Sequence, residues 1–174
     1  MCTVFTLLLS TILVSCSAQK HKKNQRKNAD KQINSRKEDS HSSVGDCDTT
    51  VWKYVYNPAR LQVMDICKTV TGTIEESSAN EDGDQHMLIR LDGGQEDLLT
   101  KRNIQKKQGC LVLEAVCVNN VTRKKVGNTC NGYVNKIEIP VVGARVKVTG
   151  SYVIDSHNGW AEIHPITKIV LLPR

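Results

Sequence analysis

The chain has 174 residues, seven of them cysteines, and a formal net charge of +6. Residues 17–45 hold eight Lys and Arg against three acidic residues, a net +5, which leaves a net +1 for residues 46–174. A nearly neutral domain of this length excludes a strongly basic nucleic-acid-binding core, and it is too short for two ordinary domains.

The chain begins with an uncharged, mostly apolar run over residues 4–14. Eleven residues are too few for a membrane-spanning helix, so the run is typical of a signal segment. It ends in Leu13-Val14-Ser15-Cys16, which resembles a bacterial lipobox, in which the cysteine thiol receives diacylglycerol. The sequence therefore predicts a lipoprotein-type signal segment (1–16) and lipidation of Cys16. The alternative is ordinary cleavage after Ala18, which would give a secreted soluble protein.

Residues 17–45 consist mainly of Lys, Asn, Gln, Ser and His, with Ile33 and Val44 as the only bulky apolar side chains. Such a segment buries too little surface to offset the entropy lost on ordering, so we expect a disordered tether. A basic run beside a lipid anchor is typical of a spacer held near anionic head groups. Nucleic-acid binding by this run is the less favoured interpretation.

The rest of the chain, residues 46–174, is rich in β-branched residues and predicts strands. Five segments have strand character: 67–75, 86–91, 110–118, 144–154 and 160–170. Two stretches, 58–64 and 96–108, are helical or irregular candidates. Five strands with a long link at 119–142, between the third and the fourth, favour an all-β fold: a five-stranded OB-like barrel with short helical or irregular loops.

Five cysteines fall in this domain, and an exported protein usually joins its cysteines in disulfides. Cys117 and Cys130 bracket the long link, and Cys47 and Cys67 would attach the N-terminal arm to the first strand. We expect these two pairs to form disulfides and Cys110 to stay a buried free thiol. The spacing does not match that of a structural zinc site.

Several strings in the domain resemble a family of small exported bacterial proteins and lipoproteins with an OB-like fold. They are CxTVTGT at 67–73, DGDxH at 82–86, LVxExxC at 111–117, VKVTGSYVxD at 146–155 and GWxEIHP at 159–165. The resemblance covers about residues 60–170 and implies the fold and the exported address, without an activity. Members of the family often carry His before the Gly-Trp pair, where this chain has Asn158 after His157.

Four polar residues could form one cluster. Glu162 and His164 lie two apart and so share a strand face, His86 belongs to the second strand, and Glu114 is the one charge in the most apolar strand. We interpret the cluster as a buried hydrogen-bond network or a ligand pocket; a site for a divalent metal is the alternative. The Asp82–Asp84 stretch is expected to be a solvated turn.

The sequence thus favours a non-catalytic, envelope-associated binding or interaction module, lipid-anchored to a membrane, with an unknown protein or small-molecule ligand and no cofactor. One alternative is a metal-dependent, nuclease-like hydrolase that uses His86, Glu162 and His164. Another is a nucleic-acid-binding OB domain, which is less favoured because the expected second and third strands lack stacking aromatic residues.

Overall fold

The computed structural model describes residues 43–173. The predicted signal segment (1–16), the lipidation site Cys16 and residues 17–42 of the predicted tether lie outside this range. The last residues assigned to the tether contribute a short strand, β1 (Ser43–Val44), which pairs antiparallel with β2 (Cys47–Asp48). In the described residues we find no helix whose length and apolar character would allow it to cross a membrane.

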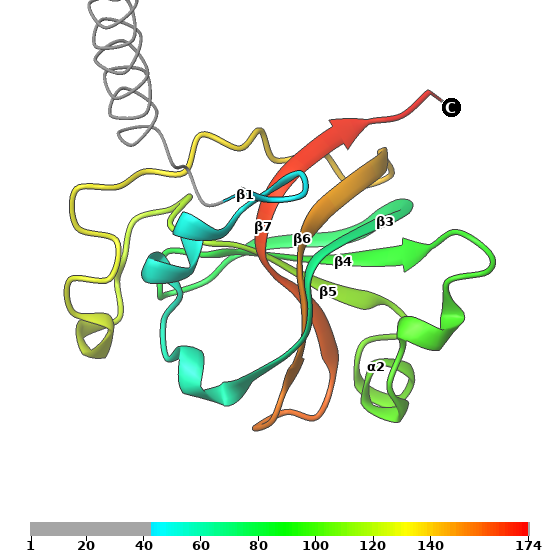
Figure 1. Ribbon diagram of the computed structural model, residues 1–174, viewed down its shortest axis with the longest axis horizontal. Helices are drawn as coiled ribbons and strands as arrows, with labels where there is room; N and C mark the ends of the chain where they lie inside the picture. The colour runs from blue at the N-terminus through cyan, green and yellow to red at the C-terminus, as the bar shows by residue number, and fades with distance from the viewer. Residues whose placement is uncertain (1–42, 174) are drawn as a thin grey trace, which may run out of the picture. The chain divides into compact units, whose positions relative to one another are not determined.

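Five strands form a sheet that closes into a ring (Figure 1). They are β3 (Leu61–Ala79), β4 (Gln85–Leu91), β5 (Leu111–Ala115), β6 (Arg145–Asp155) and β7 (Ala161–Leu171). The spatial order is β3-β4-β5-β7-β6, and β6 returns to β3. Every pairing is antiparallel except that of β5 with β7, which is parallel. The prediction of a mostly β domain with five strands and few helices is confirmed.

Strand β3 closes the ring because its two halves have different partners. Residues 61–73 pair with β6 and residues 72–79 pair with β4. The register is irregular at residues 63–68 opposite β6 and at residues 74–76 opposite β4, and β-bulges of this kind bend a strand. Gly72 pairs with both neighbours, and a Cβ there would collide with the backbone of Arg90. The helical expectation for residues 58–64 is wrong beyond a single turn, η2 (Pro58–Arg60), because from Leu61 the backbone pairs with β6.

Alternate side chains of the strands fill the inside of the ring. Met87 and Ile89 from β4, and Leu111 and Leu113 from β5, are fully buried in the main core. Val112 faces the opposite way and is also buried, in a smaller cluster with half-buried Trp160 at its edge. Strand β5 is therefore apolar except at Glu114, because both of its faces are covered.

The predicted helical stretch 96–108 forms a short turn, η3 (Glu96–Leu98), and the helix α2 (Lys101–Lys106). The fully buried Asn103 side chain donates to the carbonyls of Cys110 and Ala161, and it accepts a bond from the Ala161 amide. One amide group thus ties α2 to the starts of β5 and β7.

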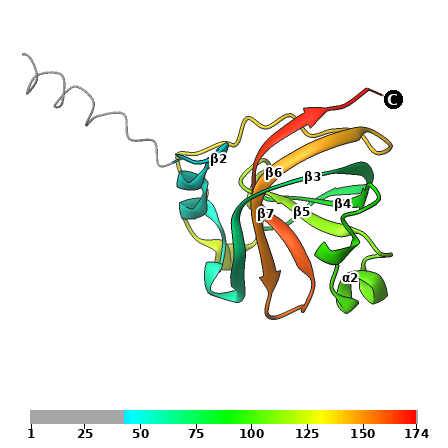
Figure 2. The same cartoon turned by 45° about the vertical axis from the view of Figure 1, so that its right-hand side comes forward.

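Two disulfides attach the irregular segments, and both pairs are those expected from the sequence: Cys47–Cys67 and Cys117–Cys130. Cys110 is free and buried. The arm turn η1 (Thr49–Tyr54) lies against the long link (Figure 2). There Tyr54 stacks on Tyr133, with ring centroids 3.8 Å apart. Apart from the turn η4 (Lys124–Val126), the link has no regular structure.

Candidate functional site

The four predicted cluster residues lie on the outer face of the ring. His86 on β4 lies opposite Glu114 on β5, and Glu162 on β7 lies beside Val112 of β5. Their chain neighbours Met87, Leu113 and Ile163 all belong to the main core. Because side chains alternate along a strand, His86, Glu114, Glu162 and His164 project away from that core.

Three of the four residues line a cleft of about 510 Å³. Its floor carries His86, Glu114 and Glu162, whereas buried His164 does not line it. Loops and turns around these strands supply the remaining walls: Tyr56, Asn57, Arg60, Ala79, Asn80, Glu81, Asp82, Lys107, Arg123, His157, Asn158 and Trp160. The cleft is therefore a polar and strongly charged space between the β3–β4 loop, the β6–β7 loop and the end of α2.

Glu162 is held by two neighbours on its own strand segment. The Trp160 indole Nε1–H donates to one carboxylate oxygen, and His164 Nδ1 lies 3.1 Å from the other. Glu162 and His164 are each only 1% exposed. Within residues 43–173, the buried Nε2 atom of His164 has no hydrogen-bond partner. The buried network expected from the sequence is present here in part.

Glu114 has a different environment. The residue is only 6% exposed, and no residue in the described range makes a hydrogen bond with its side chain. Burial, reinforced by the negative charges of Glu162 and Asp84, raises the pKa of Glu114 well above its ordinary value. The floor of the cleft thus holds a carboxyl group that makes no hydrogen bond within the described residues and whose oxygens face the open space of the cleft.

His86 and Trp160 together hold the end of a lysine side chain. The Lys107 ammonium donates to His86 Nε2 over 3.1 Å, and it lies 4.1 Å from the centre of the Trp160 ring, a cation–π distance. Burial, and secondarily the Lys107 charge, lowers the pKa of His86. The neutral imidazole therefore acts as an acceptor for an ammonium group.

A second charged pair shapes the β6–β7 loop. Asp155 is fully buried and pairs with Arg60, and it also accepts bonds from the His157 and Asn158 amides and from the Asn158 side chain. These contacts set the course of the loop that leads into Trp160. Sequence reasoning did not identify Asp155, Arg60 or Lys107, because their partners are distant in the chain.

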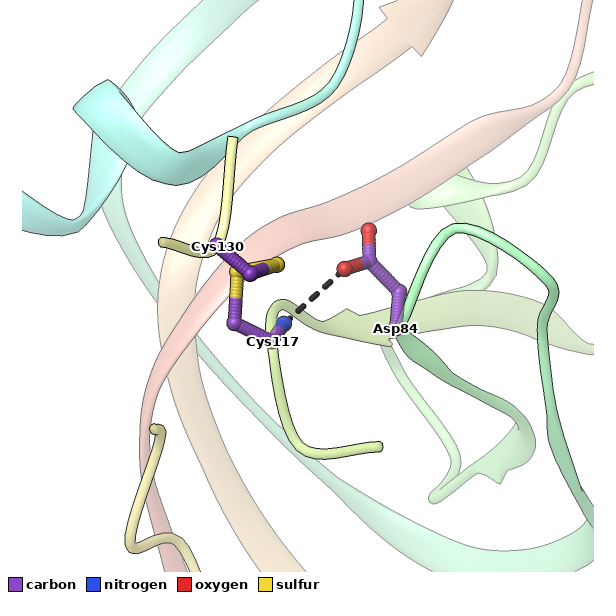
Figure 3. A group of neighbouring side chains, drawn as sticks. All are labelled: Asp84, Cys117 and Cys130. Atoms are coloured by element: carbon purple, nitrogen blue, oxygen red, sulfur yellow. Dashed lines mark hydrogen bonds between the residues drawn. A yellow bond between two sulfur atoms is a disulfide. The ribbon is translucent and has the colours of Figure 1, made fainter. Parts of the chain in front are cut away.

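Asp84 is not part of a solvated turn, contrary to expectation. It is 3% exposed and accepts the Cys117 amide over 2.9 Å, so it ties the β3–β4 loop to the Cys117–Cys130 disulfide (Figure 3). Burial raises the pKa of Asp84 to about 6. This carboxyl group has a structural role at the back of the site.

The described residues do not provide a convergent set of free ligand atoms for a metal ion. In the described part of the chain, Asp84, Cys117 and Cys130 are the only three residues whose ligand atoms gather within 4.8 Å of one another. Both sulfurs of this group belong to the disulfide and cannot act as thiolates. The residues predicted as metal ligands, His86, Glu114, Glu162 and His164, do not bring three ligand atoms within that distance.

Comparison with models of known protein families and with curated proteins finds no match to the chain. The fold and the geometry of the cleft are therefore the features that bear on function.

Proposed function

We propose that this chain is a non-catalytic binding module whose ligand occupies the outer cleft. The single observation that carries the proposal is the state of Glu114, a buried carboxyl group without a hydrogen-bond partner among residues 43–173, at the floor of an open cleft. Leaving such a group unpaired costs free energy, and a ligand that pairs with it recovers that free energy.

An OB-like barrel is the finer interpretation of the fold. In favour of it are the ring order β3-β4-β5-β7-β6 and the parallel pairing of β5 with β7. OB domains bind ligands on the face of their second and third strands, between the first and last hairpin loops. The cleft has the corresponding walls, with His86 from β4, Glu114 from β5 and residues of the β3–β4 and β6–β7 loops.

The two alternative functions have less support. A nucleic-acid ligand would bring phosphates beside Glu81, Asp82 and Glu162, which line the cleft with Glu114. A metal-dependent hydrolase would need three or more convergent ligand atoms, and the polar cluster brings no such set together within 4.8 Å. Binding without catalysis is the proposal that these residues favour.

We further propose that the module is exported to the bacterial cell envelope and is anchored to a membrane by lipid on Cys16. The two disulfides favour an oxidising compartment, and the Leu13-Val14-Ser15-Cys16 string favours lipidation. Substitution Cys16→Ala should move the protein from the detergent phase to the aqueous phase in a partitioning assay. Persistence of the variant in the detergent phase would show that the anchor proposal is wrong.

The two tryptophans provide a test of the cleft. Trp160 lines it, whereas the Trp52 indole donates to Ser151 and does not line it. We would screen neutral saccharides, amines and carboxylic acids by NMR against the full chain labelled with ¹⁵N. A cleft ligand should shift the Trp160 indole signal and leave the Trp52 signal in place. If no compound shifts Trp160 selectively, the binding proposal fails.

A further inference from the structure

We infer that the ligand of the outer cleft presents an alkylammonium or guanidinium group to Glu114 and Asp82. This inference rests on the proposed binding function and adds the chemical class of the ligand. It follows from the pairing of the charges that line the cleft and from the one cation that the cleft already holds.

The basic residues of the cleft are all engaged by other groups of the protein. Arg60 pairs with buried Asp155, and Arg123 pairs with Glu81 over 3.2 Å. Lys107 is held by His86 and by the Trp160 ring. None of these three cations makes an ion pair with Glu114, Asp82 or Glu162 in the described part of the chain. Each of the three cations that line the cleft is therefore already held by another group of the protein.

Two acidic residues of the cleft are left without a cation. Glu114 is nine-tenths buried and has no hydrogen-bond partner within residues 43–173. Among residues 43–173, the Asp82 carboxylate accepts only the Asp84 amide, over a long 3.4 Å. Besides burial, the charges of Glu162, Asp84 and Asp82 raise the pKa of Glu114, whereas the charge of Arg60, which pairs with Asp155, lowers it. A positive hydrogen-bond donor is what this part of the cleft lacks.

The cleft already binds an ammonium group elsewhere. The indole face of Trp160 and the neutral His86 imidazole hold the Lys107 ammonium by a cation–π contact and a hydrogen bond. This arrangement indicates that the walls suit organic cations. The cation of the ligand would take the separate position at Glu114, where no lysine or arginine of the described residues forms a salt bridge.

An organic cation fits this position better than a metal ion does. Metal ligation needs oxygen or nitrogen atoms that converge on one point, and the cleft residues do not gather three of them within 4.8 Å. An ammonium group donates three hydrogen bonds, and a guanidinium group donates five, to acceptors at wider spacing. The free volume of about 510 Å³ accommodates a small molecule or one extended side chain.

Calorimetric titration of the full chain with matched lysine derivatives tests the charge requirement. Nα-acetyl-lysine amide carries one ammonium group, Nα,Nε-diacetyl-lysine amide is neutral, and Nα-acetyl-glutamate amide is an anion. We expect the ammonium compound to bind, and the other two to bind at least tenfold more weakly. Butylamine separates a free amine from an amino-acid side chain: equal affinity favours a free amine, and tenfold weaker binding favours a side chain of a peptide.

Two variants test the position of the cation. Glu114→Gln keeps the size of the side chain and removes the carboxylate form that a bound cation would stabilise, so binding of Nα-acetyl-lysine amide should weaken at least tenfold. Glu138→Gln, an exposed position that does not line the cleft, should leave affinity unchanged. Equal binding of the neutral compound, or unchanged affinity in Glu114→Gln, would overturn the inference.

The same measurements distinguish failure of this inference from failure of the binding proposal. If a neutral saccharide or a carboxylic acid shifts the Trp160 indole signal and no amine does, the cleft binds a ligand but the ligand is not a cation. If no compound of any charge shifts that signal, both the inference and the proposed function are wrong.

Discussion

His86 and Glu114 lie directly opposite each other on antiparallel strands, and both line the same cleft. Their pKa values nevertheless shift in opposite directions. Burial disfavours the charged form of each, so it lowers the pKa of the imidazole and raises that of the carboxyl group. The His86 imidazole accepts a hydrogen bond from the Lys107 ammonium, whereas the Glu114 carboxyl group makes no hydrogen bond within the described residues.

Removing the charge of Glu114 should stabilise the protein. Its pKa is raised in the folded state, so the carboxyl group reduces stability as the pH rises through that folded value. At pH 8, Glu114→Gln should increase the free energy of unfolding by about 1–3 kcal/mol, because the neutral amide fills the same space without the penalty for burying a charge. Urea unfolding checks this, with Glu138→Gln as the control. An unchanged or lower midpoint for Glu114→Gln would contradict it. Stability gained at the expense of binding is typical of a functional site.

Asp84 should make stability fall as the pH rises from about 4 to about 6. Its pKa is raised from 3.8 to about 6, so in this interval the folded state binds more protons than the unfolded state. Asp84→Asn removes this dependence, and at pH 7.5 it should be more stable than the wild type by about 3 kcal/mol at most. At pH 3.5 both proteins should unfold at similar urea concentrations. Parallel stability curves over the whole range would show that Asp84 is not responsible.

Gly150 should not tolerate a side chain. It lies at an irregularity in the pairing of β6 with β7, where a Cβ would collide with the Pro165 carbonyl oxygen and approach Ile166 Cα to 2.9 Å. Gly150→Ala should lower the free energy of unfolding by about 1–3 kcal/mol, because backbone atoms must move. Gly93→Ala is the matched control, since a Cβ there meets only Glu96 Oε1, at 4.0 Å. Its effect should stay within about 0.5 kcal/mol in thermal unfolding.

The Cys117–Cys130 disulfide should contribute strongly to stability. It closes a loop with a sequence separation of 13, and the backbone N–H of Cys117 donates a hydrogen bond to the Asp84 carboxylate. Replacing both cysteines by serine should cost about 3 kcal/mol, mainly through the added entropy of the unfolded chain. Unfolding in urea under oxidising conditions measures the loss. A double variant as stable as the wild type would mean that native contacts alone hold the long link.

Much of the fold could be predicted because it depends on local patterns. Alternating or continuous apolar runs and the turn residues between them identified all five strands of the ring. The positions of the cysteines, on either side of the link and at the two ends of the arm, identified both disulfides. The length of β3 could not be predicted in this way. Its first residues owe their strand conformation to pairing with β6, from Leu61 opposite Asp155 onward, and such long-range pairing leaves no local signal.

The site could be predicted only in part. The two-residue period of a strand placed Glu162 and His164 on one face, and a common cluster with His86 and Glu114 was proposed only on the condition that the faces of three strands coincide. The structure brings His86, Glu114 and Glu162 to one cleft. Register between strands decides which residues become partners, and no local pattern encodes it. For that reason the sequence missed the contact of Lys107 with His86 and the burial of Asp84 behind the disulfide.

The Asn103 amide has one more consequence. It fixes the start of β7 at Ala161, next to Trp160, and it belongs to the helix after which Lys107 follows directly. The indole ring and the ammonium above it are therefore positioned by a single buried group that touches neither of them. This wall of the cleft is preorganised: a ligand need not supply the free energy to assemble it, and a change at Asn103 would alter the cleft without touching any of its lining residues.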